Sequence, residues 1–232
     1  MSASSMTVRD LRRLWKPHKE RLGDHPTAVR FHRACSWLDQ AEKFQNDESI
    51  DVKMIHQWIA FNALYGQWDA AYGEPAPDRQ GWKALLARII KIDAAQHVAG
   101  ALVENKKLAA IIVGDKYLQR RFWREPNSKA HGSPGTAAAE MNDLIYRGEW
   151  LRATERLMEA VYLLRCQLMH GAATSGGRMN RLELKNCTRM MDHLIRAILL
   201  VWIEKGADED WGEMCYPPVA KVGSSAAANS AQ

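Results

Sequence analysis

The sequence predicts an all-α protein, an antiparallel bundle of four core helices. Residues that favour helices (Ala, Leu, Met, Arg, Glu) are common, whereas Val, Ile and Thr are scarce. Apolar residues also recur at three- and four-residue steps in several long segments. With 232 residues, the chain can bury a substantial core. We expect one domain over residues 1–218, followed by a disordered Ser- and Ala-rich tail over 219–232.

A short helix is expected at the N-terminus, from Val8 to Trp15. Pro17 should stop it, because proline lacks the backbone N–H group that a helix interior needs. This stretch is strongly basic, and a solvated cationic face is the favoured interpretation. An arm that contacts RNA is the alternative. The cations are Arg9, Arg12, Arg13, Lys16, Lys19 and Arg21.

The first two core helices are expected within residues 27–72. The first covers about 27–44, and the second about 52–72, with Asp51 as its N-cap. In the second helix, Asn62 falls on a face that is otherwise apolar and aromatic. Asn62 is therefore expected to brace helix packing through hydrogen bonds. The other residues on this face are Ile55, Trp58, Ile59 and Tyr65.

Residues 73–148 are expected to form a helical insertion between the second and third core helices. Its first part, Gly73 to Asp78, is rich in Pro and Gly and predicts a loop. Helices are expected around residues 82–90, 102–113 and 115–124, and a loop over 127–135.

The last two core helices are expected at about 149–170 and 181–205. Gly171 stands where a glycine commonly terminates a helix. The final helix places apolar residues on one face: Leu184, Cys187, Met190, Met191, Leu194, Ile198, Val201 and Trp202.

Composition excludes some classes of function and permits others. The net charge of +5 permits an acidic partner such as RNA without requiring one. The four cysteines form no C-x-x-C pair, and no nucleotide-binding or zinc-protease motif occurs, so we expect neither a cofactor nor a metal. The chain lacks an apolar run of membrane-spanning length, and we expect a cytoplasmic protein with reduced thiols and no membrane partner.

The most informative segment is Leu-Leu-Arg-Cys-Gln-Leu-Met-His-Gly, residues 163–171. It places Arg165 and His170 five positions apart near the end of the third core helix. A second segment, Trp-Ile-Ala-Phe-Asn-Ala-Leu-Tyr-Gly, occupies residues 58–66. Together, these segments resemble the HEPN superfamily, whose signature is Arg, four to six residues, then His on a helix. The resemblance covers residues 27–72 and 149–205, but neither the insertion nor the tail.

The resemblance implies a metal-independent endoribonuclease, with Arg165 and His170 as catalytic residues. A histidine can transfer a proton near neutral pH, and an arginine can bind phosphate oxygens in a bidentate manner. Many active members carry a polar residue, often Asn, directly after the arginine, whereas this chain has Cys166. A non-catalytic HEPN module that binds RNA or protein is therefore the alternative.

On a helical wheel, Arg165 and His170 point about 140° apart. A homodimer would bring two copies of each residue around one groove. Met158, Tyr162 and Met169 are expected to form an apolar patch beside that groove. The resemblance also implies a toxin or antiphage effector, with a nucleotidyltransferase-like antitoxin as a further partner.

Several other residues are candidates for the site. Cys166, Asn62, Tyr162 and Met169 are expected to flank Arg165 and His170. Residues 119–124 mix cations with aromatic residues, a combination that can bind single strands. Its candidate RNA-binding residues are Arg120, Arg121 and Arg124. The alternative is an amphipathic helix with a solvated basic side.

Asp93 and His97 are a further candidate pair, four residues apart in the sequence. We interpret it as a helix-surface pair rather than as metal ligands, because no third ligand follows at useful spacing.

Overall fold

The computed structural model describes residues 6–46, 49–127, 134–172, 174, 176–177 and 180–217. This part of the chain is predominantly helical, which confirms the predicted all-α class. Its strands are two short antiparallel segments, β1 (Trp68–Asp69) and β2 (Glu74–Pro75). The expected tail over 219–232 lies outside the described residues. None of the described helices has the length and apolarity needed to cross a membrane.

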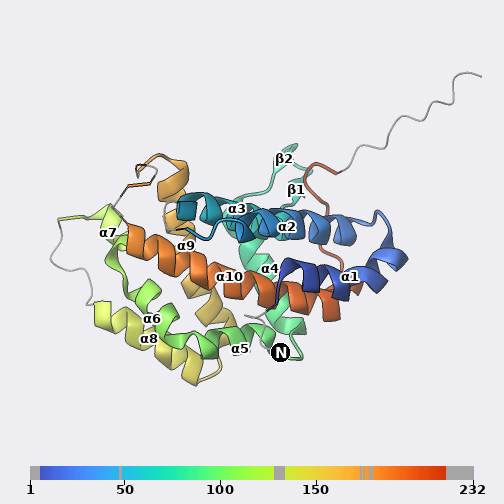
Figure 1. Cartoon of the computed structure of the whole chain (residues 1–232). Helices are drawn as coiled ribbons and strands as arrows, with labels where there is room; N and C mark the ends of the chain where they lie inside the picture. Colours follow the sequence, from blue (N-terminus) through green and yellow to red (C-terminus); the bar gives the residue numbers. More distant parts are fainter. Residues whose placement is uncertain are drawn as a thin grey trace, which may run out of the picture.

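Helix α10 forms the centre of the fold. Figure 1 shows it crossing the molecule, with α2 and α3 on one side and α5, α6 and α8 on the other. Every residue from 194 to 203 is buried, as expected for a helix enclosed on all sides. The sequence predicted one buried face, but α1 and α5 cover the remaining ones. The helices are α1 (Val8–Leu22), α2 (Pro26–Glu42), α3 (Ile50–Tyr65), α5 (His97–Glu104), α6 (Lys106–Gly114), α8 (Pro134–Tyr146) and α10 (Arg181–Glu204).

Helix α1 continues through Pro17, so the predicted stop there was wrong. The missing N–H group of Pro17 leaves only the Arg13 carbonyl without its helical donor. Both residues are exposed, so water can hydrogen-bond to that carbonyl. Three buried side chains hold α1 against the core: Val8, Leu11 and Trp15.

Helix α3 is shorter than predicted, ending at Tyr65 rather than near residue 72. The chain turns at Gly66 and continues into the β1–β2 hairpin. The predicted N-cap was also wrong, because Ser49 occupies that position. Asp51 lies in the first turn, where it forms an ion pair with Arg181 at 3.0 Å.

The insertion belongs to the same core as the four predicted core helices, because one continuous cluster of buried apolar residues runs from Val8 to Trp211. The helix expected over 102–113 is divided into α5 and α6 at Asn105, whose side chain donates to the Ala101 carbonyl. Helix α8 was not predicted. The remaining elements of the insertion are α4 (Asp78–Ile92), the 3-10 turn η3 (Lys116–Leu118) and α7 (Arg120–Arg124).

Helix α9 (Trp150–Met169) confirms the third predicted core helix, as α10 confirms the fourth. His170 is the C-cap residue of α9. Gly171 has φ of +70°, the left-handed conformation that commonly follows a helix end. The end of α9 is thus determined by the local sequence.

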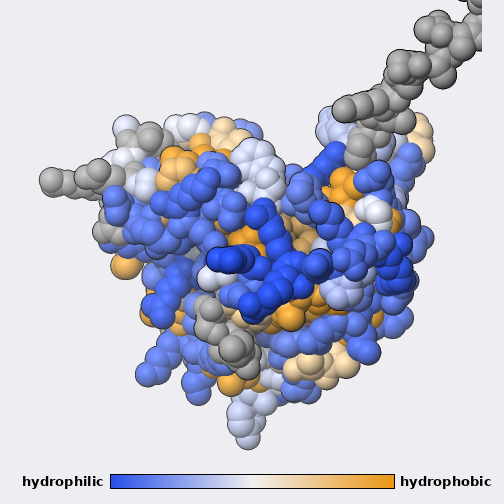
Figure 2. All heavy atoms as spheres, turned by 45° about the vertical axis from the view of Figure 1, so that its right-hand side comes forward, coloured by the Kyte–Doolittle hydropathy of each residue, from blue (hydrophilic) through white to orange (hydrophobic). Residues whose placement is uncertain are grey.

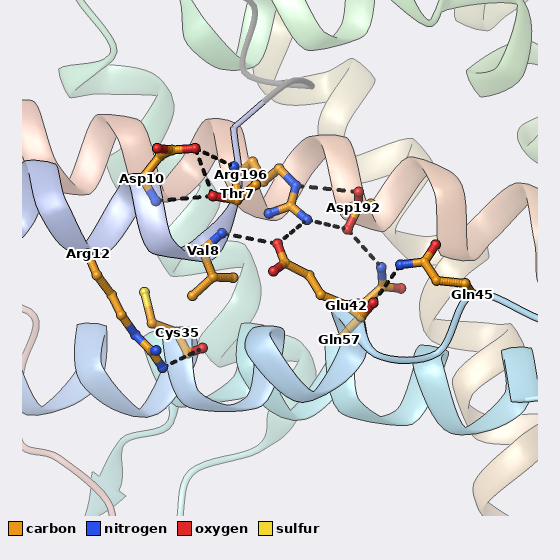
Figure 3. A network of polar contacts seen from close by, with 10 residues as sticks. All are labelled: Thr7, Val8, Asp10, Arg12, Cys35, Glu42, Gln45, Gln57, Asp192 and Arg196. Carbon is orange, nitrogen blue, oxygen red and sulfur yellow. Dashed lines mark hydrogen bonds and ion pairs between the residues drawn. The ribbon is translucent and has the colours of Figure 1, made fainter.

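The surface is mostly hydrophilic, and a network of charged side chains also lies in the interior. Figure 2 shows hydrophilic side chains covering most of one face. In the interior, Arg196 of α10 has a side chain only 6% exposed. It contacts Glu42 at 2.9 Å and Asp192 at 3.1 Å (Figure 3). Glu42 also accepts from the Val8 backbone N–H, and Gln57 donates to Asp192, so this network joins α1, α2, α3 and α10.

Acid is expected to destabilise the protein partly through His193. This half-buried side chain has no hydrogen-bond partner among the described residues, and burial lowers its pKa below the ordinary 6.5. The unfolded chain therefore binds this proton more readily, and stability is lost as pH falls through about 6.5 toward the folded pKa. In urea titrations at about pH 7 and pH 5.5, His193→Leu should lose less stability than the wild type. An equal loss in both proteins would contradict this role.

Candidate functional site

Arg165 lies on α9 and is held by residues from three helices. Its Nη2 atom lies 3.3 Å from Oδ2 of Asp78, the first residue of α4. The guanidinium also lies over the rings of Trp58 and Tyr162, at 5.6 and 5.8 Å from their centroids. The side chain is 24% exposed, so the charge is partly removed from solvent. Cation–π contacts strengthen in such an environment, and they fix the guanidinium in place.

The other oxygen of Asp78 accepts a hydrogen bond from the Tyr65 hydroxyl at 2.8 Å. Burial, and then the Asp78 charge, raise the pKa of Tyr65, so its hydroxyl remains a donor at neutral pH. The Asp78 carboxylate lies in the first turn of α4, where the helix dipole favours a negative charge. Asp78 therefore connects a permanent hydrogen-bond donor with the Arg165 cation.

His170 lies in a different environment from Arg165. It is exposed at the end of α9, where its backbone N–H donates to the Cys166 carbonyl at 3.0 Å. Within the described residues, the imidazole makes no hydrogen bond. The two residues are separated by about 7.5 Å of rise along the helix. One chain therefore fixes the arginine and leaves the histidine accessible, and no hydrogen bond joins the two.

The predicted flanking residues differ in how closely they approach Arg165. Tyr162 contacts it directly, and burial, followed by the nearby Cys166, raises the pKa of Tyr162. Asn62 is half-buried and, among the described residues, makes no hydrogen bond with Arg165, but it lines a cavity of about 380 Å³ together with Tyr65 and Asp78.

The predicted apolar patch is smaller than expected. Met158 is 1% exposed and belongs to the core, so its assignment to an exposed patch was wrong. Tyr162 is half-buried, whereas Met169 is 56% exposed. Met158 is buried because α4, α6 and α8 pack against α9, and sequence periodicity did not reveal these contacts.

A second cluster of charges surrounds Glu159, six residues before Arg165 on α9. Glu159 accepts from Arg79 Nε at 2.7 Å, and lies 3.4 Å from Lys83 and 3.6 Å from Arg120. The Arg120 guanidinium also lies 5.8 Å from the ring centroid of Tyr162. Arg120 and Arg165 therefore both contact the same tyrosine.

An aromatic surface lies beside the end of α9. The rings of Phe122 and Trp123 meet edge to face at 5.1 Å, and Phe122 meets Tyr117 at the same distance. Trp123 is 48% exposed. Gln167 of α9 donates to the Tyr117 carbonyl at 2.9 Å, which ties this surface to the segment between Arg165 and His170.

The predicted RNA-binding arginines have different surroundings. Arg120 is engaged with Glu159 and Tyr162, as described above. Arg121 and Arg124 are exposed on the short helix α7. The cationic and aromatic side chains thus occur on one element, next to the α9 end.

The pair Asp93 and His97 does not form the expected side-chain contact. Asp93 instead accepts from the backbone N–H groups of His97 and Val98, both at 2.8 Å, and so caps α5. The His97 ring contacts Glu204 at 2.8 Å. Across the part of the chain that the structure describes, no group of three His, Cys, Asp or Glu side chains is arranged to hold a metal ion.

Comparisons of the chain with protein-family models, with curated proteins and with solved structures find no match. A function is therefore assigned from the surroundings of Arg165 and His170.

Proposed function

We propose that this protein is a metal-independent endoribonuclease of HEPN type. The observation that supports this most is the contrast between Arg165 and His170 on α9. Asp78, Trp58 and Tyr162 hold Arg165 in position, and His170 is exposed at the end of the same helix. An immobilised cation and an accessible proton carrier are what phosphodiester cleavage without metal requires.

In the proposed reaction, the 2′-oxygen of a ribose attacks the adjacent phosphorus, and the bond to the 5′-oxygen breaks. His170 accepts the proton of the 2′-hydroxyl, and a second imidazole donates a proton to the leaving oxygen. Arg165 stabilises the charge on the phosphate oxygens. The products are a 2′,3′-cyclic phosphate and a 5′-hydroxyl.

The second imidazole would come from a second copy of the chain. Because one chain separates Arg165 from His170, a two-fold pairing of α9 ends supplies both residue types to one groove. Exposed apolar residues at the α9–α10 connection support this arrangement, with Met169 at 56% and Leu182 at 64% exposure. Light scattering at micromolar concentration tests it, and a strict monomer would contradict the shared site.

The aromatic surface of η3 and α7 would bind the single-stranded substrate. Exposed aromatic rings stack on bases irrespective of sequence, and neighbouring cations contact phosphates. Lys116 lies 4.8 Å from the Tyr117 ring centroid, and Arg124 lies on the same short element as Trp123. A toxin or antiphage role, with a nucleotidyltransferase-like antitoxin, is the biological setting we propose.

The direct test is incubation of a mixed RNA pool with the purified protein in EDTA. We expect cleavage, with 2′,3′-cyclic phosphate ends detected by mass spectrometry. Cleavage that disappears on adding EDTA, or products with 3′-hydroxyl ends, would contradict the proposed mechanism.

Removing the Asp78 charge is expected to lower cleavage about tenfold, equivalent to about 1.4 kcal/mol of transition-state stabilisation. Asp78→Asn loses the ion pair with Arg165, so only the Trp58 and Tyr162 rings still hold the guanidinium, and its position is less restricted. Single-turnover cleavage rates measure this effect. Glu140→Gln is the matched control, because Glu140 pairs with Arg156 on another part of α9. An equal rate loss in both variants would contradict a specific role for Asp78.

The alternative function is a non-catalytic HEPN module that binds RNA or protein. The ion pair between Arg165 and Asp78 favours it, because the arginine charge is already compensated. The presence of Cys166 in place of Asn favours it as well. Under this alternative, the protein binds RNA but gives no products in the EDTA assay.

A further inference from the structure

A groove of about 1300 Å³ lies between α1 and α2, formed by elements that do not carry Arg165 or His170. Trp15 and Phe31 form its floor, stacked with their ring centroids 4.3 Å apart. Cationic side chains form its walls: Arg9, Arg12, Arg13, Lys16, Lys19 and Arg33. Figure 2 shows the face that includes α1, where strongly hydrophilic side chains cross the centre with hydrophobic atoms between them.

The lining of this groove has a strong excess of positive charge. Among the described residues, six cationic and two acidic side chains line it, the acids being Asp10 and Asp24. The lining therefore carries a net charge of +4, compared with +5 for the whole chain. Such a concentration of one sign attracts polyanions over long range.

Three of the six cations are engaged within the fold. Arg12 donates to the Cys35 carbonyl at 3.3 Å and lies 3.8 Å from Asp39. Arg13 pairs with Asp10 at 3.0 Å, and Arg33 donates to the carbonyls of Cys215 and Tyr216 at 3.3 and 2.8 Å. Lys16 lies 3.9 Å from Glu20 on the exposed surface, a pair of little energetic value. The Arg9 and Lys19 side chains make no hydrogen bond or ion pair within the described residues. The groove thus keeps cationic side chains available for a ligand.

The cations on α1 are also regularly spaced. Arg9, Arg13, Lys16 and Lys19 recur at three- and four-residue steps, which places them on one side of the helix. From Arg9 to Lys19 the helix rises about 15 Å. A linear ligand with a repeated negative charge matches such a row.

We propose that the α1–α2 groove binds the sugar-phosphate backbone of an RNA strand. The choice of RNA as the polyanion rests on the proposed function, whereas the groove itself is separate from the Arg165–His170 site. An acidic protein is the less suitable partner, because the apolar floor residues Trp15 and Phe31 are only 3% and 1% exposed. Protein interfaces depend on accessible apolar and aromatic anchors, whereas nucleic-acid interfaces are polar and positively charged.

The test measures binding separately from cleavage. The probe is a fluorescent, 2′-O-methylated RNA of about 20 nucleotides, which lacks the nucleophilic hydroxyl and stays intact. Its affinity is measured by anisotropy across a range of salt concentrations, for the full chain and two triple variants. The groove variant is Arg9→Gln, Lys16→Gln and Lys19→Gln. The control, Lys91→Gln, Lys106→Gln and Lys107→Gln, removes the same charge from exposed positions on α4 and α6.

We expect the groove variant to bind at least about tenfold more weakly and to lose about 2 from the slope of log affinity against log salt, since each single-strand phosphate contact contributes about 0.7. The control should match the wild type. An unchanged slope in the groove variant, or no binding by the wild type, would overturn the proposal. Binding through the groove without cleavage of unmodified RNA would uphold this proposal while contradicting the endoribonuclease.

Discussion

Replacing His170 with alanine is expected to lower RNA cleavage by about 10²- to 10⁴-fold, the usual contribution of a general acid or base. His170 is exposed and makes no side-chain hydrogen bond within the described residues, so its loss should leave the fold intact. The measurement is the initial cleavage rate of an RNA pool in EDTA, with circular dichroism to confirm the helical content.

Tyr146→Ala is the matched control for His170→Ala, because Tyr146 is also an exposed ring at the C-terminal end of a helix, α8, and has no part in the proposed site. It should cleave RNA within a few-fold of the wild type. Added imidazole should partly restore cleavage by His170→Ala, since a small base can occupy the vacated space. Full activity in His170→Ala would remove His170 from the mechanism and leave the binding module as the function.

The fold was predicted best where the local sequence determines it. Helix α9 ends where Gly171 takes the left-handed conformation, and α10 follows its apolar pattern. Predictions failed where tertiary contacts override local signals. Pro17 is accommodated because water reaches its unbonded carbonyl partner, and α3 stops at Tyr65 because the following backbone pairs with a segment far away in the sequence.

The candidate site was predicted only in part, because some of its residues are defined by local sequence and others by tertiary contacts. The spacing of Arg165 and His170 was visible in the sequence, and their positions on α9 follow from helix geometry. Asp78 was assigned to a loop, and its contact with Arg165 arises only when α4 packs against α9. Glu159 and Gln167 were overlooked because their roles depend on partners in the insertion. In the sequence, nothing distinguished Asp78 from other acidic residues in loops.

The insertion therefore contributes directly to the proposed site. Asp78 positions Arg165, and η3 and α7 place aromatic rings beside the α9 end. The resemblance to the HEPN superfamily excluded this region, yet residues from the region surround the motif. We infer that the insertion positions Arg165 and contacts the substrate, whereas the proposed reacting groups belong to α9.

Replacing Arg30 with methionine is expected to destabilise the protein by about 3–5 kcal/mol, because several buried backbone carbonyls lose their charged donor. Arg30 is fully buried in α2, and its guanidinium donates to the Leu64 and Gly66 carbonyls at 3.2 and 2.7 Å. It also donates to the carbonyls of Gly212 and Glu213, at 3.3 and 3.2 Å. Burial lowers the pKa of Arg30 to about 10, so it stays charged at neutral pH.

Urea denaturation measures the effect of Arg30→Met, with Arg9→Met as the exposed control. Arg30→Met should lower the free energy of unfolding of the whole chain and also loosen one region, because Arg30 joins the end of α3 to residues 211–213. Hydrogen exchange in that segment should accelerate in Arg30→Met more than exchange in α10. A loss below about 1 kcal/mol, within the range of ordinary surface substitutions, would contradict this role.

Release of the C-terminal segment would also reach the candidate site. Met214 and Cys215 line the same cavity as Asp78, and Cys215 donates from its thiol to the Gln67 carbonyl at 2.6 Å. If the segment detaches in Arg30→Met, the wall beside Asp78 opens to water and the ion pair with Arg165 weakens. Cleavage by Arg30→Met, measured at a temperature where the variant remains folded, should therefore fall toward the level of Asp78→Asn. Wild-type cleavage by the folded variant would show that Arg30 stabilises the chain without influencing the site.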